Sequence, residues 1–394
     1  MKDFNFYAPT RVVFGRESEE KLPQLIKQYG GTKVLLHYGG GSARRSGLLD
    51  KVEKMLDEAG ISYVELGGVV PNPLLSKVRE GIALCRQEKV DFILAVGGGS
   101  VIDSSKAIGY GVGYKGDVWD FWNGKAVSQS CLPIGVMLTI PAAGSEMSSS
   151  TVITNDEGML KRGFNSDLCR CKFAIMNPER TYTLPPYQTA AGATDIMMHT
   201  MERYFSKYED AILTDAIAEA LLRTVKEAVF EVLRNPEDYP NRAAIMWASS
   251  LSHNDLTECG TEKDFACHKL EHELSGLFGV THGAGLAAVW GSWARYVMDR
   301  HLSRFVKFAV NVMGVTNDFI NPKATAVKGV EATERFFHAI GMPTSIPELI
   351  GRQATEEEIA IMTEKCSRGG TITLGAMEVL KTEDMTEIYR LANK

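Results

Sequence analysis

Residues 92–108 read FILAVGGGSVIDSSKAI, and this stretch decides the fold. Its first six residues are apolar and rich in strand formers, which predicts a buried strand. Three glycines and Ser100 then form a turn, and a helical pattern follows. Backbone N–H groups of such a turn converge with those of the helix N-terminus, and glycine lets a phosphate approach because it has no Cβ. The stretch therefore predicts a strand-turn-helix unit that binds an anion.

The same glycine-rich tetrapeptide occurs twice. The two copies are Gly39, Gly40, Gly41, Ser42 and Gly97, Gly98, Gly99, Ser100. The first also follows a strand-like run, KVLLHY at 33–38. Two such turns suit a ligand with phosphate and ribose groups spread over two strand ends, as in a dinucleotide. Neither has the G-x-G-x-x-G spacing, so we expect a variant of the Rossmann fold, and tight turns without a ligand remain the alternative.

Arg44 and Arg45 follow the first turn, which contains no acidic residue. A carboxylate there would bind a ribose 2′-hydroxyl and repel a 2′-phosphate, whereas open glycines beside arginines accept the phosphate. The turn therefore favours NADP(H), with NAD(H) as the second possibility. Exposed arginines are also common without a ligand, so that simpler interpretation stays open.

The chain divides into two regions of different pattern. Up to residue 186, strand-like runs such as PIGVMLTI (133–140) alternate with helical patterns such as LLSKVREGIALCRQE (74–88). This alternation predicts an α/β layer with a mostly parallel sheet. Paired prolines at 185 and 186 interrupt it, and only helical patterns follow. We therefore expect an α/β dinucleotide-binding domain at 1–186 and an all-α domain at 187–394.

Length and charge narrow the class of protein. At 394 residues the chain exceeds what one hydrophobic core usually supports, which agrees with two domains. Its formal net charge of -6 argues against nucleic acid or an anionic membrane as a partner. The first residues lack the apolar core of a signal peptide, and no run of about 18 apolar residues follows, so we expect a cytoplasmic protein. The 7 cysteines include no Cys-x-x-Cys pair, which is typical of reduced thiols.

Residues 193–200 read ATDIMMHT and place Asp195 and His199 among isoleucine and methionine. Burying a carboxylate or an imidazole without a partner is costly. Four residues apart on a helix, the two side chains point the same way, so they can bind one object together. A metal ion would compensate the carboxylate and fix the imidazole.

A second segment supplies further imidazoles. CHKLEHELSGLFGVTHGAG, at 267–285, holds His268, His272 and His282. A single buried histidine is more often a hydrogen-bonded core residue than a ligand. We leave His253 in that class, together with His37, His301 and His338, whose contexts look exposed. One carboxylate and three imidazoles have the hardness expected for Fe2+ or Zn2+. The predicted metal ligands are Asp195, His199, His268 and His282.

Several segments together carry a resemblance to a known family. They are YAPTRVVFG, VVPNP, VGGGSVIDSSKAI, LTIPAAGSEMS, NPERTYTLPPYQTAAGATDIMMHTMERYF and HKLEHELSGLFGVTHGAGLA. The chain resembles the iron-containing alcohol dehydrogenases, and within them the butanol dehydrogenase-like branch, over essentially its whole length. The order Asp-x3-His, then His-x13-His, is highly specific to that family. The resemblance implies a dehydroquinate synthase-like fold, a homodimer, and metal binding at the four residues named above.

The resemblance also implies the cofactor contacts. The pyrophosphate loop falls on Gly97 to Ser100, with Asp103 beside it near the nicotinamide end. Other positions that match cofactor-lining residues are Asn72, Thr139, Ser148 and Lys161. The turn at Gly39 to Ser42 is similar to that of the NADPH-using members, where other members have an aspartate. Three departures from the wider family are PAAGSE at 141–146, NPE at 177–179 and Cys267 beside a ligand.

The implied reaction is hydride transfer between NAD(P)H and a small primary alcohol or aldehyde such as butanol or butyraldehyde. A metal with an open position would act as the Lewis acid. His272, one helical turn beyond His268, is the candidate for the proton path or a substrate contact, and a hydrogen-bonding partner of a metal ligand is the alternative. The apolar neighbours favour a small apolar substrate; they are Met197, Met198, Leu270, Leu277 and Phe278.

Three other hypotheses remain open. A polyol (glycerol-type) dehydrogenase or a dehydroquinate synthase-like enzyme would need several cations near the metal for polyol-phosphate or carboxylate substrates, and only Lys269 is near in the sequence. A dinucleotide or metal sensor without turnover is a hypothesis from a different class. The third hypothesis is that these histidines are ordinary core residues and bind no metal.

Overall fold

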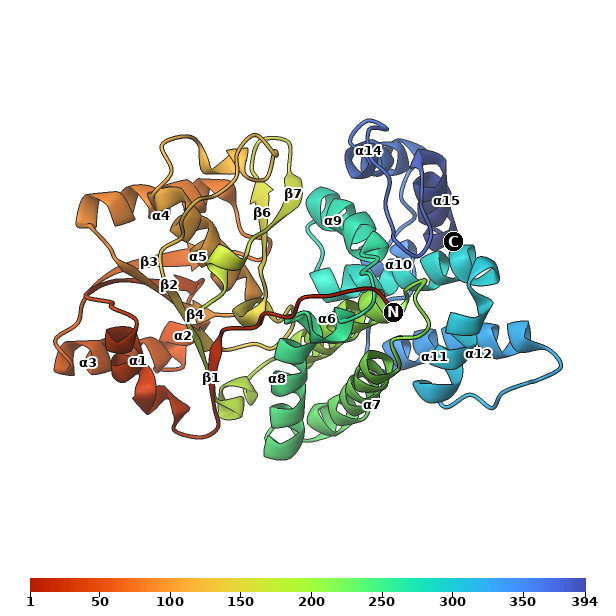
Figure 1. Ribbon diagram of the computed structural model, residues 1–394, viewed down its shortest axis with the longest axis horizontal. Coiled ribbons are helices and arrows are strands. Elements are labelled where there is room, and N and C mark those ends of the chain that lie inside the picture. The colour runs from red at the N-terminus through yellow and green to blue at the C-terminus, as the bar shows by residue number, and fades with distance from the viewer. The chain divides into compact units, whose positions relative to one another are not determined.

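The computed structural model describes all residues from Met1 to Lys394 (Figure 1). The chain forms two compact units, Tyr7–Thr183 and Leu184–Lys394, and the second also includes Met1–Phe6. The first six residues belong to the helical unit because Lys2 N donates to Gly260 O at 2.9 Å and the Met1 amino group pairs with Asp210. The sequence interpretation placed these six residues in the α/β domain.

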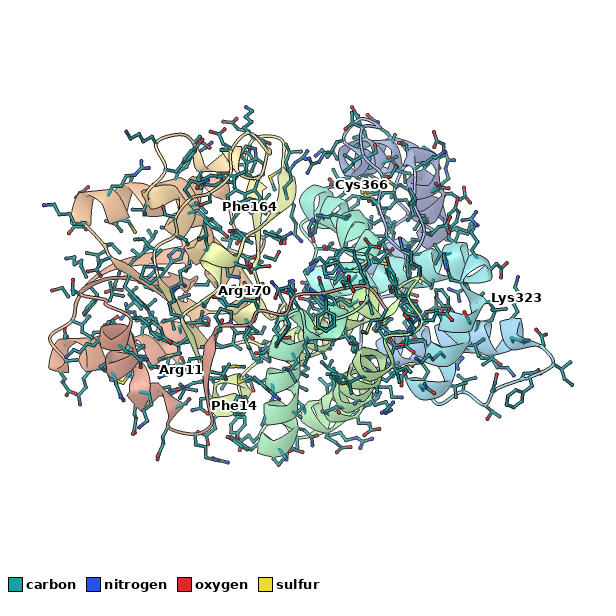
Figure 2. The ribbon with its side chains drawn as sticks, viewed as in Figure 1. Arg11, Phe14, Phe164, Arg170, Lys323 and Cys366 are labelled. Carbon is teal, nitrogen blue, oxygen red and sulfur yellow. The ribbon has the colours of Figure 1, made fainter.

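A six-stranded sheet forms the centre of the α/β unit, in the order β1-β8-β5-β4-β2-β3. All of its pairings are parallel. Its strands are β1 (Arg11–Phe14), β2 (Lys33–Gly39), β3 (Ser62–Val69), β4 (Phe92–Gly97), β5 (Ile134–Leu138) and β8 (Phe173–Met176). Every residue of β4 is buried, as expected for a parallel strand with helices on both faces. β1 is an edge strand, and its Arg11 and Phe14 are exposed (Figure 2).

Helices cover both faces of this sheet (Figure 1). They are α1 (Leu22–Gln28), α2 (Ser42–Arg45), α3 (Leu48–Glu58), α4 (Leu75–Glu88) and α5 (Gly99–Val112). The apolar side chains of α1 and α3 share one core with those of β2 and β4. α4 and α5 pack against each other on the opposite face. This architecture confirms the predicted α/β class, and the parallel pairing places the carboxyl ends of the strands at one edge of the sheet.

A short antiparallel hairpin, β6 (Ser150–Asn155) and β7 (Leu160–Asn165), follows the sheet strand β5. It packs on α5, and Trp122 Nε1 donates to Thr151 O at 3.1 Å. The sequence interpretation did not include this hairpin. The sequence contained the signal for this hairpin. TVIT is a run rich in β-branched residues, and the glycine-containing turn at 155–159 separates it from a second run with an aromatic residue.

The second unit is helical, which confirms the predicted all-α class. Its helices are α6 (Pro186–Tyr204), α7 (Ile212–Arg234), α8 (Tyr239–His253), α9 (Ala266–Phe278), α10 (His282–Val297), α11 (Leu302–Asn311), α12 (Pro322–Ala339), α13 (Ile346–Ile350), α14 (Glu356–Ser367) and α15 (Thr382–Ala392). α6 is its central helix, because every residue from Thr189 to Tyr204 is buried. α10 packs closely on α6: a Cβ on Gly283 would lie 2.1 Å from Ala191 O. None of these helices is both long enough and apolar enough to cross a membrane.

Candidate metal centre and dinucleotide-binding turns

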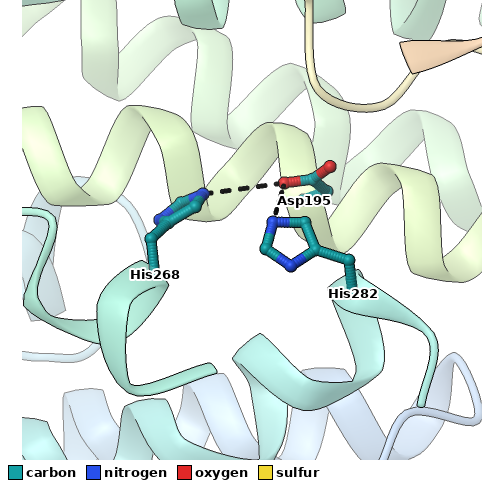
Figure 3. Close-up of side chains that lie close together, drawn as sticks. All are labelled: Asp195, His268 and His282. Atoms are coloured by element: carbon teal, nitrogen blue, oxygen red, sulfur yellow. Dashed lines mark ion pairs between the residues drawn. The ribbon is translucent and has the colours of Figure 1, made fainter. Parts of the chain in front are cut away.

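Three predicted ligands converge inside the helical unit (Figure 3). Asp195 comes from α6, His268 from the first turn of α9, and His282 is the first residue of α10. Asp195 Oδ1 lies 3.8 Å from His268 Nε2 and 3.7 Å from His282 Nε2, and the three atoms lie within 4.8 Å of one another. Ligand atoms bound to one tetrahedral ion at roughly 2.1 Å lie about 3.4 Å apart, so the observed separations are close to those of a metal site.

Two atoms of this group lack hydrogen-bond partners. Asp195 Oδ1 and His268 Nε2 are buried and make no hydrogen bond within the protein, although His199 Nδ1 lies 2.9 Å from Asp195 Oδ1. Leaving a buried polar atom unsatisfied costs about 1–3 kcal/mol, and more when it is charged. A cation between the two atoms would remove both penalties. The donor set, one carboxylate oxygen and imidazole nitrogens, therefore fits Fe2+ or Zn2+.

The other ring nitrogens explain why Nε2 is the ligand atom. His199 Nδ1 lies 3.0 Å from Asp195 O, and a carbonyl oxygen can only accept, so Nδ1 carries the proton. His268 Nδ1 contacts the Glu202 carboxylate, and His282 Nδ1 contacts the Glu271 carboxylate. In each neutral ring the lone pair is therefore on Nε2.

His199 does not belong to the converging group. Its ring centroid lies 4.3 Å from that of His268, and its Nδ1 lies 2.9 Å from Asp195 Oδ1. The structure therefore brings Asp195, His268 and His282 together and places His199 beside them. As the fourth ligand, His199 stays a prediction.

The charges around the cluster are strongly perturbed. Burial alone would raise the pKa of Asp195, but the neighbouring imidazoles, His199 first, hold it well below its usual range. Burial and the adjacent His268 lower the pKa of His199 to about 4. Burial also acts to lower the pKa of His268, but the Glu202 carboxylate outweighs it and raises that pKa to about 9. At neutral pH Asp195 is thus ionised and His199 neutral, as each must be as a ligand, whereas His268 is protonated and has to release its Nε2 proton when a metal binds.

The glycine-rich turn after β4 leads into a long helix. A Cβ on Gly98 would lie 2.1 Å from Ile140 Cγ2, and one on Gly97 would lie 2.5 Å from Val101 Cγ2, so packing itself requires glycine at both positions. α5 begins at Gly99 and extends over 14 residues. In its first turn Val101 N and Ile102 N donate to Gly98 O, which leaves the N–H groups of Gly99 and Ser100 suitable for a pyrophosphate.

The identical tetrapeptide after β2 forms a different structure. Gly41 has a φ of 120°, in the region that favours glycine, and α2 contains only 4 residues. Arg44 is paired with Glu65 at 2.6 Å and with Asp50 at 3.1 Å, and it also contacts Glu53. Arg45 makes no ion pair, and its Nη1 lies 3.1 Å from the position of a Cβ on Gly41. Carboxylates therefore neutralise the guanidinium of Arg44 but not that of Arg45.

Comparisons with known proteins agree with this geometry. The family model of the iron-containing alcohol dehydrogenases matches residues 9–178, and the model of the family's C-terminal domain matches residues 189–393. The chain belongs to the iron-containing alcohol dehydrogenase family. The resemblance read from its motifs is thereby confirmed.

Individual relatives of this alcohol dehydrogenase family member cover nearly its whole length. It is 40% identical to the NADH-dependent butanol dehydrogenase A of Clostridium acetobutylicum, over 99% of both chains. It is 34% identical to the NADPH-dependent aldehyde reductase YqhD of Escherichia coli, over 100% of both chains. The crystal structure of NADH-dependent butanol dehydrogenase A from Thermotoga maritima superposes with a TM-score of 0.96 at 38% identity, covering 100% of this chain and 99% of the other.

Several predicted cofactor residues of this family member take part in one network. Asp103 accepts from Ser145 Oγ at 2.6 Å and from Val152 N at 2.9 Å. Ser148 Oγ accepts from Ser150 N at 3.2 Å. These contacts tie the loop at 145–150 to α5. Lys161 is buried on β7, Thr139 N donates to Gly97 O at 3.1 Å, and Asn72 has a left-handed φ of 55°.

Sequence reasoning missed Lys106, which holds the same loop. Its side chain is completely buried, and Nζ donates to Ser145 O at 2.7 Å, Ser150 O at 2.8 Å and Ser148 O at 3.0 Å. The signal was the single basic residue of the helix at 99–112, whose first two turns otherwise hold Asp103 and small or apolar residues. A buried ammonium surrounded by oxygen acceptors fixes backbone conformation at the position predicted to line the cofactor.

One prediction about the surroundings of the metal needs correction. Met197, Met198 and Leu270 are fully buried in the core of the helical unit, so they form no substrate surface and do not inform the choice of substrate. Leu277 and Phe278 are partly buried against that core. His272 is buried on α9, with its ring centroid 6.0 Å from that of His282, and its role in the proton path or in substrate contact stays a prediction.

His37 was also placed wrongly. It is completely buried, its Nδ1 lies 2.7 Å from Leu66 O, and its Nε2 lies 2.8 Å from Ser104 Oγ. Its strand is buried on both faces, so the alternation of the sequence does not distinguish an inward from an outward position. His338 is exposed as expected, and His253 packs beside His199 with 4.2 Å between ring centroids.

Proposed function

We propose that this protein is a metal-dependent alcohol dehydrogenase and aldehyde reductase that uses NAD(P)H with small primary alcohols or aldehydes such as butanol and butyraldehyde. The observation that carries the proposal is the buried, unsatisfied pair of Asp195 Oδ1 and His268 Nε2, with His282 Nε2 beside it. The names of the butanol dehydrogenase and aldehyde reductase relatives support the substrate class.

The residues that would hold the metal are Asp195, His268 and His282, with His199 as the predicted fourth ligand. A divalent metal bound there supplies a Lewis acid that polarises the substrate oxygen and lowers the pKa of an alcohol. The side chains are already oriented for a metal, because Asp195 is ionised and each ring directs its Nδ1 at an oxygen acceptor, and metal binding would displace the Nε2 proton of His268. Burial of Asp195 and His268 shields their ligand atoms from water, whereas His282 is partly exposed.

The α/β unit would bind the dinucleotide. Backbone N–H groups of Gly99 and Ser100 at the start of α5 are suited to the pyrophosphate, and the loop at 145–150 is held in place by Lys106 and Asp103. The nicotinamide supplies the hydride chemistry. His272 is proposed as the group that passes a proton or contacts substrate, because it is a buried imidazole one helical turn from His268.

The preference between cofactors would be set at the turn after β2. The open glycines and the unpaired Arg45 support NADPH, whereas the three carboxylates around Arg44 reduce the positive potential. We therefore propose that both cofactors are used and that NADPH is preferred. The homodimer and the cytoplasmic location stay predictions.

The test is reduction of butyraldehyde after anaerobic purification with Fe2+ or Zn2+. The wild type should turn over with NADPH and with NADH and should lose activity after chelation. His268→Ala should reduce turnover at least about 100-fold, since removal of one ligand weakens metal binding. His338→Ala, which changes an exposed histidine, serves as the matched control and should behave like the wild type. Activity that survives both chelation and His268→Ala would contradict the proposal.

A further inference from the structure

Two carboxylates adjoin the metal cluster without belonging to it. Glu202 on α6 and Glu271 on α9 are both completely buried. Glu202 contacts His268 Nδ1, and Glu271 contacts His282 Nδ1. In both rings the opposite nitrogen, Nε2, is the atom directed at Asp195 Oδ1. Each carboxylate therefore lies behind one predicted ligand, on the side away from the shared oxygen.

Glu202 also fixes the backbone that carries His268. Its Oε1 accepts from Cys267 N at 2.6 Å, and its Oε2 lies 3.3 Å from His268 N. The residue before α9, Phe265, has a left-handed φ of 57° and offers no side-chain cap, so Glu202 satisfies N–H groups that the first turn leaves open. One carboxylate thus sets both the backbone and the ring of the same histidine.

Small residues on α9 and α10 make room for the Glu271 side chain. Ser275 Oγ, one turn along α9, donates to Glu271 Oε1. On α10, a Cβ at Gly285 would lie 2.9 Å from both Cγ and Oε1 of Glu271. Any larger residue at Gly285 would displace the glutamate from His282. The glycine three residues after His282 is therefore explained by the carboxylate behind the ring.

We infer that Glu202 and Glu271 are positioning residues for the metal centre, each accepting the Nδ1 proton of one histidine so that the Nε2 lone pair stays directed at the position next to Asp195. The inference rests on the proposed function, because it assigns these residues to the metal ligands. A carboxylate behind an imidazole fixes its tautomer and orientation and makes it a stronger ligand. Loss of such a partner lowers metal affinity about 10- to 100-fold.

The experiment measures Co2+ affinity by competition with a chelator, using the absorbance of the bound ion, together with thermal unfolding of the metal-free protein. The variants are Glu271→Gln and Glu202→Gln, which keep the shape of the side chain and remove its charge. Glu219→Gln is the matched control, because Glu219 is a buried carboxylate that accepts from Tyr204 OH at 2.8 Å and touches none of the cluster histidines. Using two variants keeps the test decisive if the capping role of Glu202 makes its variant fold poorly.

Glu271→Gln is expected to bind Co2+ about 10- to 100-fold more weakly than the wild type. Glu219→Gln is expected to keep an affinity within about twofold of wild type. Without metal, Glu271→Gln should unfold at a temperature no lower than that of Glu219→Gln. A merely structural role would lower the unfolding temperature and leave the Co2+ affinity of the folded protein unchanged. Wild-type Co2+ affinity in both Glu271→Gln and Glu202→Gln would overturn this inference but not the proposed function. A wild type that binds no Co2+ would overturn the proposed function as well.

Discussion

His37 in the α/β unit and His268 in the helical unit are both buried, yet their hydrogen bonds differ. At His37, a backbone carbonyl at 2.7 Å and a hydroxyl at 2.8 Å satisfy the two ring nitrogens. At His268, Glu202 satisfies Nδ1, but Nε2 makes no hydrogen bond and lies 3.8 Å from Asp195 Oδ1. Asp195 Oδ1 makes no hydrogen bond either, although His199 Nδ1 lies 2.9 Å from it. Burial is common to both sites. The unfilled hydrogen-bonding capacity is what distinguishes a ligand site from a core histidine.

The same distinction applies to the two arginines after β2. Three carboxylates surround Arg44, whereas Arg45 makes no ion pair. A side chain that is already paired within the protein has little to gain from a ligand, because binding would exchange one partner for another. Paired and unpaired groups of the same residue type therefore give matched sets for experiments.

The largest effect is expected from Asp195→Asn. The amide keeps the shape of the side chain but removes the charge that faces His268 and His282, so bound metal and turnover should both fall at least about 100-fold. The measurement is metal content per chain together with butyraldehyde reduction. Asp264→Asn is unsuitable as a control because Asp264 accepts from three backbone N–H groups. Asp57→Asn is preferred, because Asp57 is an exposed residue of α3. Normal metal content in Asp195→Asn would contradict the contrast drawn between the hydrogen-bonded His37 and the metal-binding His268.

His37 should make the stability of the α/β unit depend on pH. Burial lowers its pKa in the folded state to about 4 from an ordinary 6.5, so its contribution is complete above pH 6.5 and is lost as the pH falls from 6.5 towards 4. Between pH 7.5 and pH 5 the wild type should lose about 2 kcal/mol of unfolding free energy from this group. His37→Asn does not titrate and should lack that part of the dependence.

The measurement is urea unfolding of wild type and His37→Asn at both pH values. The variant should be less stable at pH 7.5, because the Ser104 contact is lost, and the difference between the two proteins should shrink at pH 5. A difference that is equal at both pH values would mean that His37 is not a neutral core residue.

The smallest effect concerns the cofactor. Arg45→Ala should raise the Kd for NADPH about 5-fold and leave the Kd for NADH within about twofold, since only NADPH carries a 2′-phosphate to pair with the free guanidinium. Arg44→Ala, the paired neighbour, should change the ratio of the two Kd values less. Fluorescence titration of each reduced cofactor measures both constants, and an unchanged NADPH-to-NADH ratio in Arg45→Ala would exclude this arginine as the phosphate contact.

Sequence patterns were most informative where chemistry and periodicity agree. The run at 92–97 was predicted as a strand and is β4, because a continuous apolar run followed by glycines has few other structures. Asp195, His268 and His282 were chosen from residue type and spacing, and the structure brings them together. The hairpin β6–β7 was missed because its strands are short and mixed in polarity.

Other features depend on packing between segments that are distant in the chain. Glu202 and His268 are 66 positions apart, and an acidic residue on a helix is ordinarily read as solvent-exposed. Lys106 was overlooked for the same reason, since the carbonyls that bind it come from a loop about 40 residues later. Two identical tetrapeptides differ because only the second is followed by a long helix.

The most direct test of the metal centre is a crystal of the Zn2+-loaded protein measured above and below the zinc absorption edge. We predict one anomalous peak per chain, bonded to Asp195 Oδ1 and to Nε2 of His268 and His282 at roughly 2.0–2.2 Å. No peak at this position, or a peak only at other residues, would contradict the account and leave the unsatisfied pair of Asp195 and His268 without an explanation.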